Sequence, residues 1–249
     1  MDASVFPLLF GFGLVLFRTA GIVVAAPVLS ARMVPVRIRA GLAFALALAA
    51  FVGAGSPRAD LPASLVALMG HALAETAVGL GAGLGARVIL DAALAAGQLA
   101  GIGMGLGFSA LVDPLGGVPS SSLGQLFSMV ALGFAVSMGI HREAVVWLAR
   151  SVHDMPPGSA ADFASFASVV IAHCLTSVAL AVRLAFPILA VVTIGHVALG
   201  LVGRLAPQLN IATLGFSVAI LAGGGAIYLV VPTAAEVAAR MAVEALTRS

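Results

Sequence analysis

The stretch from Gly97 to Gln125 reads GQLAGIGMGLGFSALVDPLGGVPSSSLGQ, and it is the most informative part of the sequence. Its first half is apolar and rich in glycine. Its second half, Asp113 to Ser122, is polar and holds two prolines and a Gly-Gly pair, before apolar sequence resumes at Leu123. This pattern predicts a polar loop between two hydrophobic helices. Because the stretch has no nucleophile–base pair, metal cluster or phosphate cradle, we interpret the loop as a plug or constriction inside a membrane assembly.

The composition identifies the class of protein. Of the 249 residues, 61% are hydrophobic and only 9% are charged, and the mean hydropathy is +1.17. A typical soluble domain has about 25% charged residues, so this chain could not cover a water-facing surface. We therefore expect a polytopic, all-α membrane protein. The net charge of +2 is too small and too scattered for a nucleic-acid-binding protein.

The apolar residues fall into about eight segments, separated by polar joints that carry prolines or arginines. Several segments are shorter than the roughly 20 apolar residues that cross a bilayer, so we expect half-helices or hairpins among them. From His141 (HREAVVWLAR) we expect an amphipathic helix that breaks at Met155-Pro156-Pro157-Gly158. We expect residues Thr233–Ser249 to form a solvated helix, because Glu236, Arg240 and Glu244 are spaced four residues apart. The segments are Val5–Ala26, Ala40–Gly55, Leu65–Gly85, Val88–Val112, Leu123–Ile140, Phe163–Ala181, Leu184–Val202 and Leu214–Val231.

Four charged residues lie inside or at the edge of apolar segments: Arg18, Glu75, Asp91 and Arg183. A charge at the bilayer centre costs about 2.5–3.5 kcal/mol on insertion scales. Such residues indicate either an ion or proton path or structural pairing between helices packed against protein. We favour structural pairing, because a proton relay would need several carboxylates. The apolar segments hold only Glu75 and Asp91, which lie on two different segments.

Glycines recur at GxxxG spacing, as in Gly79/Gly83 and Gly101/Gly105. This spacing lets helix backbones approach closely in a membrane. The alternative is that glycine is ordinary filler in these membrane helices. The glycines do not form GxGxxG after a strand, so they do not predict dinucleotide binding.

The sequence predicts no enzyme, no metal site and no cofactor. Its five histidines are dispersed and lack metal-ligand spacing. Ser120, Ser121 and Ser122 are not in a GxSxG motif and have no obvious base nearby. Cys174 lies in an apolar run, so we expect its small side chain to be buried in the core.

Four stretches together resemble one family, the FliR family of flagellar export-gate proteins and its more distant injectisome counterparts (SctT). They are Leu16–Leu48, Gly101–Gln125, Gly139–His141 with the LARSVHDMPPG that follows, and Gly200–Ile220. The combination of Arg204, Pro207, Gln208 and Asn210 with the Asp113-Pro114 loop is specific. Ser217 departs from the family, which often has a proline there. Gly215-Phe216 looks more flagellar than injectisome-like.

The resemblance implies a structural subunit that joins FliP and FliQ in a helical assembly with a closed pore. FlhB and FlhA would lie nearby, within the flagellar basal body (rod and MS ring) of the bacterial inner membrane, and unfolded flagellar subunits would be exported. Residues 1–249 would form one export-gate domain, with a FliP-like part at roughly 1–180 and a FliQ-like part at roughly 181–249. The alternatives are the equivalent subunit of a virulence injectisome or a secondary transporter using Glu75 and Asp91.

The resemblance also implies two sets of functional residues. The expected pore plug comprises Phe108, Asp113, Pro114, Gly116, Gly117, Pro119, Ser120 and Ser121. The residues expected to pack helices and hold the assembly together are Arg18, Pro27, Pro35, Arg37, Gly101, Gly105, Arg204, Pro207, Gln208 and Asn210.

Overall fold

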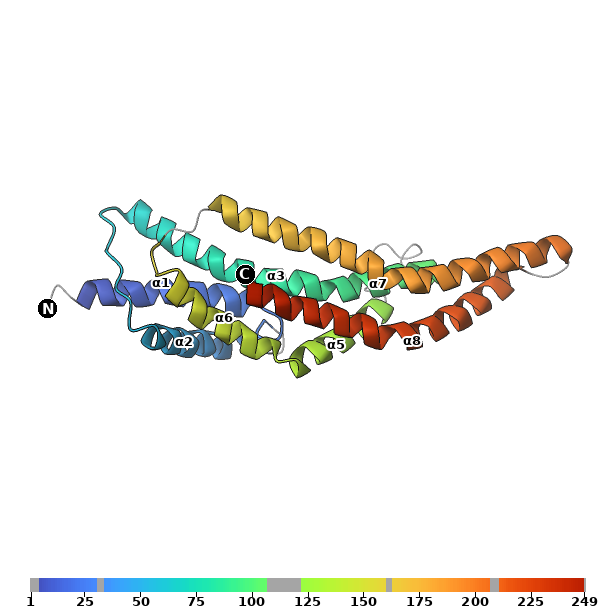
Figure 1. The fold of residues 1–249 in the computed structure, drawn as a ribbon, viewed down its shortest axis with the longest axis horizontal. Helices are drawn as coiled ribbons and strands as arrows, with labels where there is room; N and C mark the ends of the chain where they lie inside the picture. Colours follow the sequence, from blue (N-terminus) through green and yellow to red (C-terminus); the bar gives the residue numbers. More distant parts are fainter. Residues whose placement is uncertain (1–4, 31–33, 107–121, 160–162, 207–210, 249) are drawn as a thin grey trace. The chain divides into compact units, whose positions relative to one another are not determined.

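The computed structural model describes residues 5–30, 34–106, 122–159, 163–206 and 211–248, and all regular structure in them is α-helical (Figure 1). The prediction of an all-α protein is confirmed. Five of these helices are long and apolar enough to cross a membrane, or up to six spans if a bent pair of shorter helices forms one span. The helices are α1 Val5–Ala25, α2 Val36–Gly53, α3 Leu65–Gly103, α5 Ser122–Ser137, α6 Ile140–Asp154, α7 Phe163–Leu205 and α8 Ile211–Arg248.

Three helices are longer than the apolar segments seen in the sequence. The segments on either side of Arg87 form one helix, α3, and those on either side of Arg183 form α7. The paired segments join into one helix because arginine is a good helix former and interrupts only the hydropathy. Helix α8 likewise continues through Pro232 into the predicted C-terminal helix, and the i,i+4 pair of Arg240 with Glu236 forms at 2.9 Å. The prediction that this helix is solvated is wrong for its other side, where Ala235 and Ala242 are fully buried.

The bend between α5 and α6 follows from its sequence. The two helices meet at an angle of 59°, and Gly139 between them has a φ of +83°, which L-residues with side chains seldom adopt. The predicted amphipathic helix is confirmed as α6. Its buried residues Ile140, Ala144, Trp147, Leu148, Ser151 and Val152 follow helical spacing.

The chain divides into two compact units, which we describe separately. The first comprises residues 1–89, 135–175 and 241–249. In it α1 packs against α2 and α6, and Phe12 of α1 meets Phe44 and Phe51 of α2 edge to face, with ring centroids 5.6 and 5.5 Å apart. The buried face of α1 includes Leu14, Val15, Ile22 and Val23, which makes α1 central to this unit.

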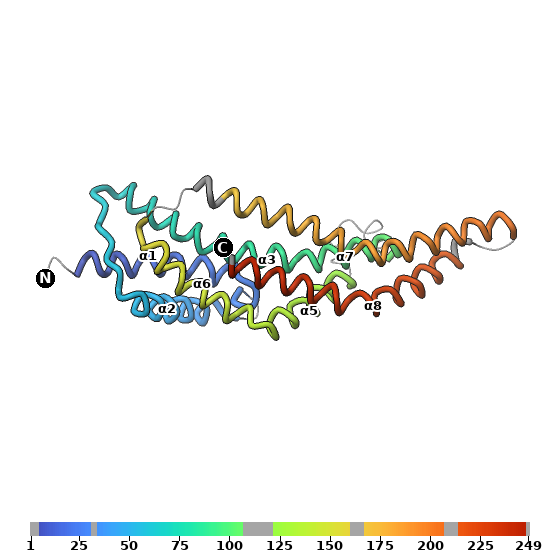
Figure 2. Tube along the Cα trace, in the orientation of Figure 1, coloured from blue at the N-terminus to red at the C-terminus, as the bar shows by residue number. Residues whose placement is uncertain are grey.

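The second unit comprises residues 90–134 and 176–240, and its interior is built largely from small residues. Buried alanines line α3 at Ala92, Ala93, Ala96 and Ala100. Figure 2 shows α7 and α8 running alongside each other in this unit, and the close approach of Gly195 to Val218 agrees. Many large apolar side chains of α7 and α8 nevertheless face outward, among them Phe186, Leu221 and Leu229.

Cys174 is exposed, so the prediction of a buried cysteine is wrong. The apolar run that suggested burial is an outward face of α7, since Ile171 and Leu175 are also exposed. An apolar pattern in a membrane helix does not distinguish a face that packs within the chain from one that meets lipid or another subunit.

Candidate functional site

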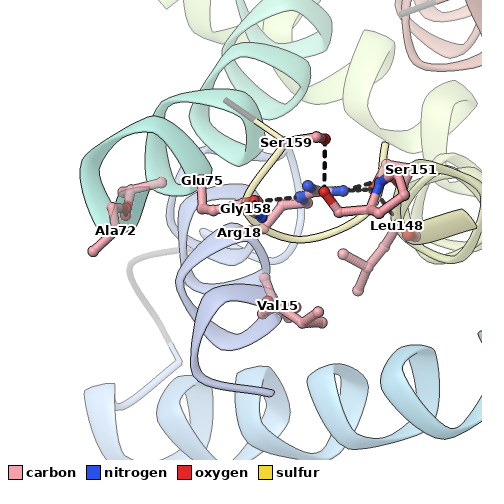
Figure 3. Close-up of polar contacts among 11 residues, drawn as sticks. Val15, Arg18, Ala72, Glu75, Leu148, Ser151, Gly158 and Ser159 are labelled. Atoms are coloured by element: carbon pink, nitrogen blue, oxygen red, sulfur yellow. Dashed lines mark hydrogen bonds and ion pairs between the residues drawn. The ribbon is translucent and has the colours of Figure 1, made fainter. Parts of the chain in front are cut away.

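The most elaborate polar site among the described residues surrounds Arg18, within the first unit. Arg18 lies on the buried face of α1 and is 1% exposed, and Glu75 of α3 is 4% exposed. The Arg18 Nε donates to Glu75 Oε2 at 2.6 Å, which forms a buried ion pair (Figure 3). Burial of either charge alone would destabilise the fold, so each residue offsets the desolvation cost of the other in an apolar bundle.

The same guanidinium reaches α6. The Arg18 Nη1 donates to the backbone carbonyl of Ser151 at 2.6 Å. The same Nη1 lies 3.4 Å from the Ser151 hydroxyl oxygen. That hydroxyl also donates to the carbonyl of Leu148 at 2.9 Å. One arginine thus ties α1 to both α3 and α6.

The second oxygen of Glu75 is satisfied by the turn after α6. Glu75 Oε1 accepts a hydrogen bond from the backbone N–H of Gly158 at 3.0 Å. Gly158 has a φ of +87°, which is strained for any residue with a Cβ. The Pro-Pro-Gly break noted in the sequence therefore has a structural reason, because it aims a backbone donor at the buried carboxylate.

Helices α1 and α3 approach closely beside this network. A Cβ built on Gly79 would collide with the carbonyl oxygen of Arg18, and one on Gly83 would lie 2.7 Å from the nitrogen of Ala26. On the facing helix, a Cβ on Gly21 would lie 2.5 Å from the carbonyl oxygen of Thr76. The prediction that Gly79 and Gly83 permit close backbone contact is confirmed.

The site joins residues that the sequence analysis treated separately. Arg18 was predicted to serve in helix packing and Glu75 was noted as an intramembrane charge, but nothing in the sequence paired them. Ser151 was given no role, and Gly158 was noted only as part of the break after the amphipathic helix. The available signal was two opposite charges, each isolated in its own apolar segment, together with a glycine after two prolines.

The structure describes several other predicted assembly residues, whose roles stay predictions. Pro27 is buried after α1, while Pro35, Arg37 and Arg204 are exposed at helix ends. Gly101 is buried in the last turn of α3. Gly105 follows that helix with a φ of +78°. The hydrogen bonds from Leu106 N to Gly101 O and from Gly105 N to Ile102 O form a Schellman motif, so Gly105 ends α3.

The predicted plug residues lie outside the described residues, as do Pro207, Gln208 and Asn210. The undescribed plug residues are Phe108, Asp113, Pro114, Gly116, Gly117, Pro119, Ser120 and Ser121. In the part of the chain that the structure describes, no group of three or more His, Cys, Asp or Glu side chains could hold a metal ion.

The described helices include candidate membrane spans, and the buried polar site in the first unit ties three of its helices together through structural hydrogen bonds. Comparison with known proteins defines the protein further. Residues 9–245 match the model of a family described as bacterial export proteins, family 1. The chain belongs to this family.

Similar proteins from several bacteria share the same name. The flagellar biosynthetic protein FliR of Escherichia coli (strain K12) is 28% identical over 209 residues, which cover 84% of this chain and 79% of the relative. FliR of Bacillus subtilis (strain 168) is 29% identical over 225 residues, covering 87% and 84%. FliR of Aquifex aeolicus (strain VF5) is 28% identical over 209 residues, covering 83% and 80%.

Family membership confirms three predictions. The resemblance to FliR is correct. The chain is an export protein and not an enzyme, and its candidate spans and its family make it a protein of the bacterial inner membrane.

Proposed function

We propose that this chain is a structural subunit of the flagellar protein export gate. The observation that carries the proposal is the match to proteins named for flagellar biosynthesis over more than four fifths of this chain. In this role the chain forms part of a closed pore for unfolded flagellar proteins, within the flagellar basal body, and the energy for export comes from other components.

The proposed partners are FliP and FliQ in the gate, with FlhB and FlhA close by and the rod and MS ring around it. Residues 1–249 act as one export-gate domain, FliP-like over roughly 1–180 and FliQ-like over roughly 181–249. The large apolar side chains that α7 and α8 leave exposed support this role, because such surfaces normally mark contacts with other proteins or with lipid. Helices that pack against neighbouring subunits need apolar side chains on their outer faces.

The polar loop from Asp113 to Ser122 is proposed to be the plug of the pore. The sequence supports it, since a proline- and glycine-containing polar segment interrupts apolar sequence beside a glycine-rich helix end. We expect deletion of Asp113–Ser122 to leave the complex assembled while making the membrane leaky to ions. The measurement is ion flux into proteoliposomes that contain the purified complex.

A second variant separates the loop's sequence from its length. Replacement of Asp113–Ser122 by glycine and serine residues, at unchanged length, keeps the connection between the helices. This variant should also leak if specific plug contacts close the pore. Assembled complexes from both variants that remain as tight as the wild type would contradict the plug role.

The injectisome alternative differs in its substrate. Loss of the chain should abolish export of flagellar subunits and swimming, and a copy supplied from a plasmid should restore both. Normal flagella together with loss of effector secretion would instead assign the chain to an injectisome.

The secondary-transporter alternative depended on Glu75 and Asp91. Both oxygens of Glu75 already have partners in the first unit, Arg18 and Gly158. That occupancy favours a structural role for this carboxylate over substrate binding. Solute uptake by the purified chain alone would favour the transporter.

A further inference from the structure

Arg183 is a charged residue in the middle of α7, and the described part of the chain provides no partner for it. It lies well inside the apolar span Ala167–Leu205, about four helical turns from the nearer end. Its side chain is exposed and has no hydrogen bond or ion pair with any described residue. A permanently charged guanidinium at such a position needs a partner supplied from elsewhere.

The surroundings of Arg183 are apolar on the same side of the helix. Val182 is 53% exposed and Phe186 67% exposed, and both face outward with it. The opposite side of the helix packs within the second unit through the buried residues Leu184, Ala185 and Ile188. Arg183 is therefore a single charge within an outward apolar face.

A second polar group lies on the same turn. Pro187 is inside α7 and has no N–H, so it cannot donate to the carbonyl of Arg183 four residues earlier. Pro187 is exposed on the same face as Arg183. Backbone groups inside a membrane are satisfied by neighbouring helices, side chains or water, and the carbonyl of Arg183 lacks its usual helical donor.

We propose that Arg183 is a docking residue for a transmembrane helix of another gate subunit, and that this helix carries an aspartate or glutamate at the contact. A carboxylate matches the guanidinium in charge and in its two-pronged geometry. The apolar neighbours Val182 and Phe186 fit an apolar helix around that carboxylate. The position also disfavours a lipid headgroup, because arginine reaches the headgroups most easily from near a helix end.

This inference rests on the proposed function, and the test distinguishes the two. The tagged chain is expressed with its own export-gate operon, and the complex is purified in mild detergent. If the wild-type chain recovers no partner subunits, the proposed function fails and this inference with it. If the wild type recovers them, the variants at position 183 test the inference alone.

Arg183→Glu should lower recovery of the partner subunits by about tenfold or more, because it places like charges together in a contact shielded from water. Arg183→Lys should recover more partner than Arg183→Glu but less than the wild type, since the charge remains while the two-pronged geometry is lost. Arg150→Glu is the matched control, because Arg150 is an exposed arginine on the amphipathic helix α6, and it should recover partners like the wild type. Wild-type recovery with Arg183→Glu would overturn the proposal.

Photo-crosslinking identifies the partner chemically. A photoreactive phenylalanine analogue at Phe186, one turn from Arg183, should form an adduct with a partner helix whose sequence holds a carboxylate near the crosslinked residue. Changing that carboxylate to arginine should restore recovery with Arg183→Glu. Adducts with lipid only, or with a helix that lacks acidic residues, would overturn the proposal.

Discussion

At the scale of single residues, the Arg18–Glu75 pair makes the clearest prediction. Replacing Arg18 by Met leaves the Glu75 carboxylate buried without its counter-charge, so the stability of the chain should fall by about 3–5 kcal/mol. Replacing both residues by Met should cost much less, because no uncompensated charge remains. Thermal unfolding of the purified protein in detergent measures both effects.

The control for this prediction is the pair of Arg142 with Glu143, whose nitrogen and oxygen lie 3.1 Å apart and whose arginine side chain is 77% exposed. Arg142→Ala should change stability by less than about 1 kcal/mol, as surface ion pairs usually do. If Arg18→Met were as mild as this control, the central place of the buried pair in the first unit would be wrong.

Gly158 gives a second prediction at this scale. Its φ of +87° is strained for alanine, although a Cβ would meet ordinary contacts, with Leu14 Cδ1 at 3.5 Å. Gly158→Ala should therefore destabilise the protein by about 1–2 kcal/mol through the backbone. Thermal unfolding in detergent measures it, and an unchanged midpoint would show that the turn adopts another conformation.

At the scale of helices, the contact of α1 with α3 depends on Gly79. Gly79→Val should prevent this contact, because a side chain would meet the backbone of Arg18, and the amount of folded protein in membranes should fall sharply. Gly70→Ala is the control on the same helix, since a Cβ there has no neighbour within 4 Å. It should be neutral or stabilise the helix by up to about 1 kcal/mol. Equal amounts of the two variants would contradict close packing.

The helices also show what the sequence alone could and could not predict. Helix α6 was predictable, because its apolar residues follow helical spacing and a Met-Pro-Pro-Gly run ends it. The continuity of α3 and α7 was not, because the charges at Arg87 and Arg183 interrupt hydropathy without interrupting backbone hydrogen bonds. The pairing of Arg18 with Glu75 needs contact between residues 57 positions apart, which no local pattern contains.

At the scale of the whole molecule, we propose that the chain acts through its shape and its contacts with other subunits. Its polar site is structural, its second unit leaves apolar helix faces exposed, and its family is one of export proteins. A chain of this kind should be incomplete alone. Its function should depend on assembly with other subunits rather than on a chemical step.

The most direct test of this account is the composition of the complex that the chain forms in its own membrane. The tagged protein should be purified in mild detergent, and its mass and subunits determined by native mass spectrometry. We expect a large complex of fixed composition that contains the two small hydrophobic gate subunits. A stable monomer without partners, recovered from cells that express the complete export apparatus, would contradict it.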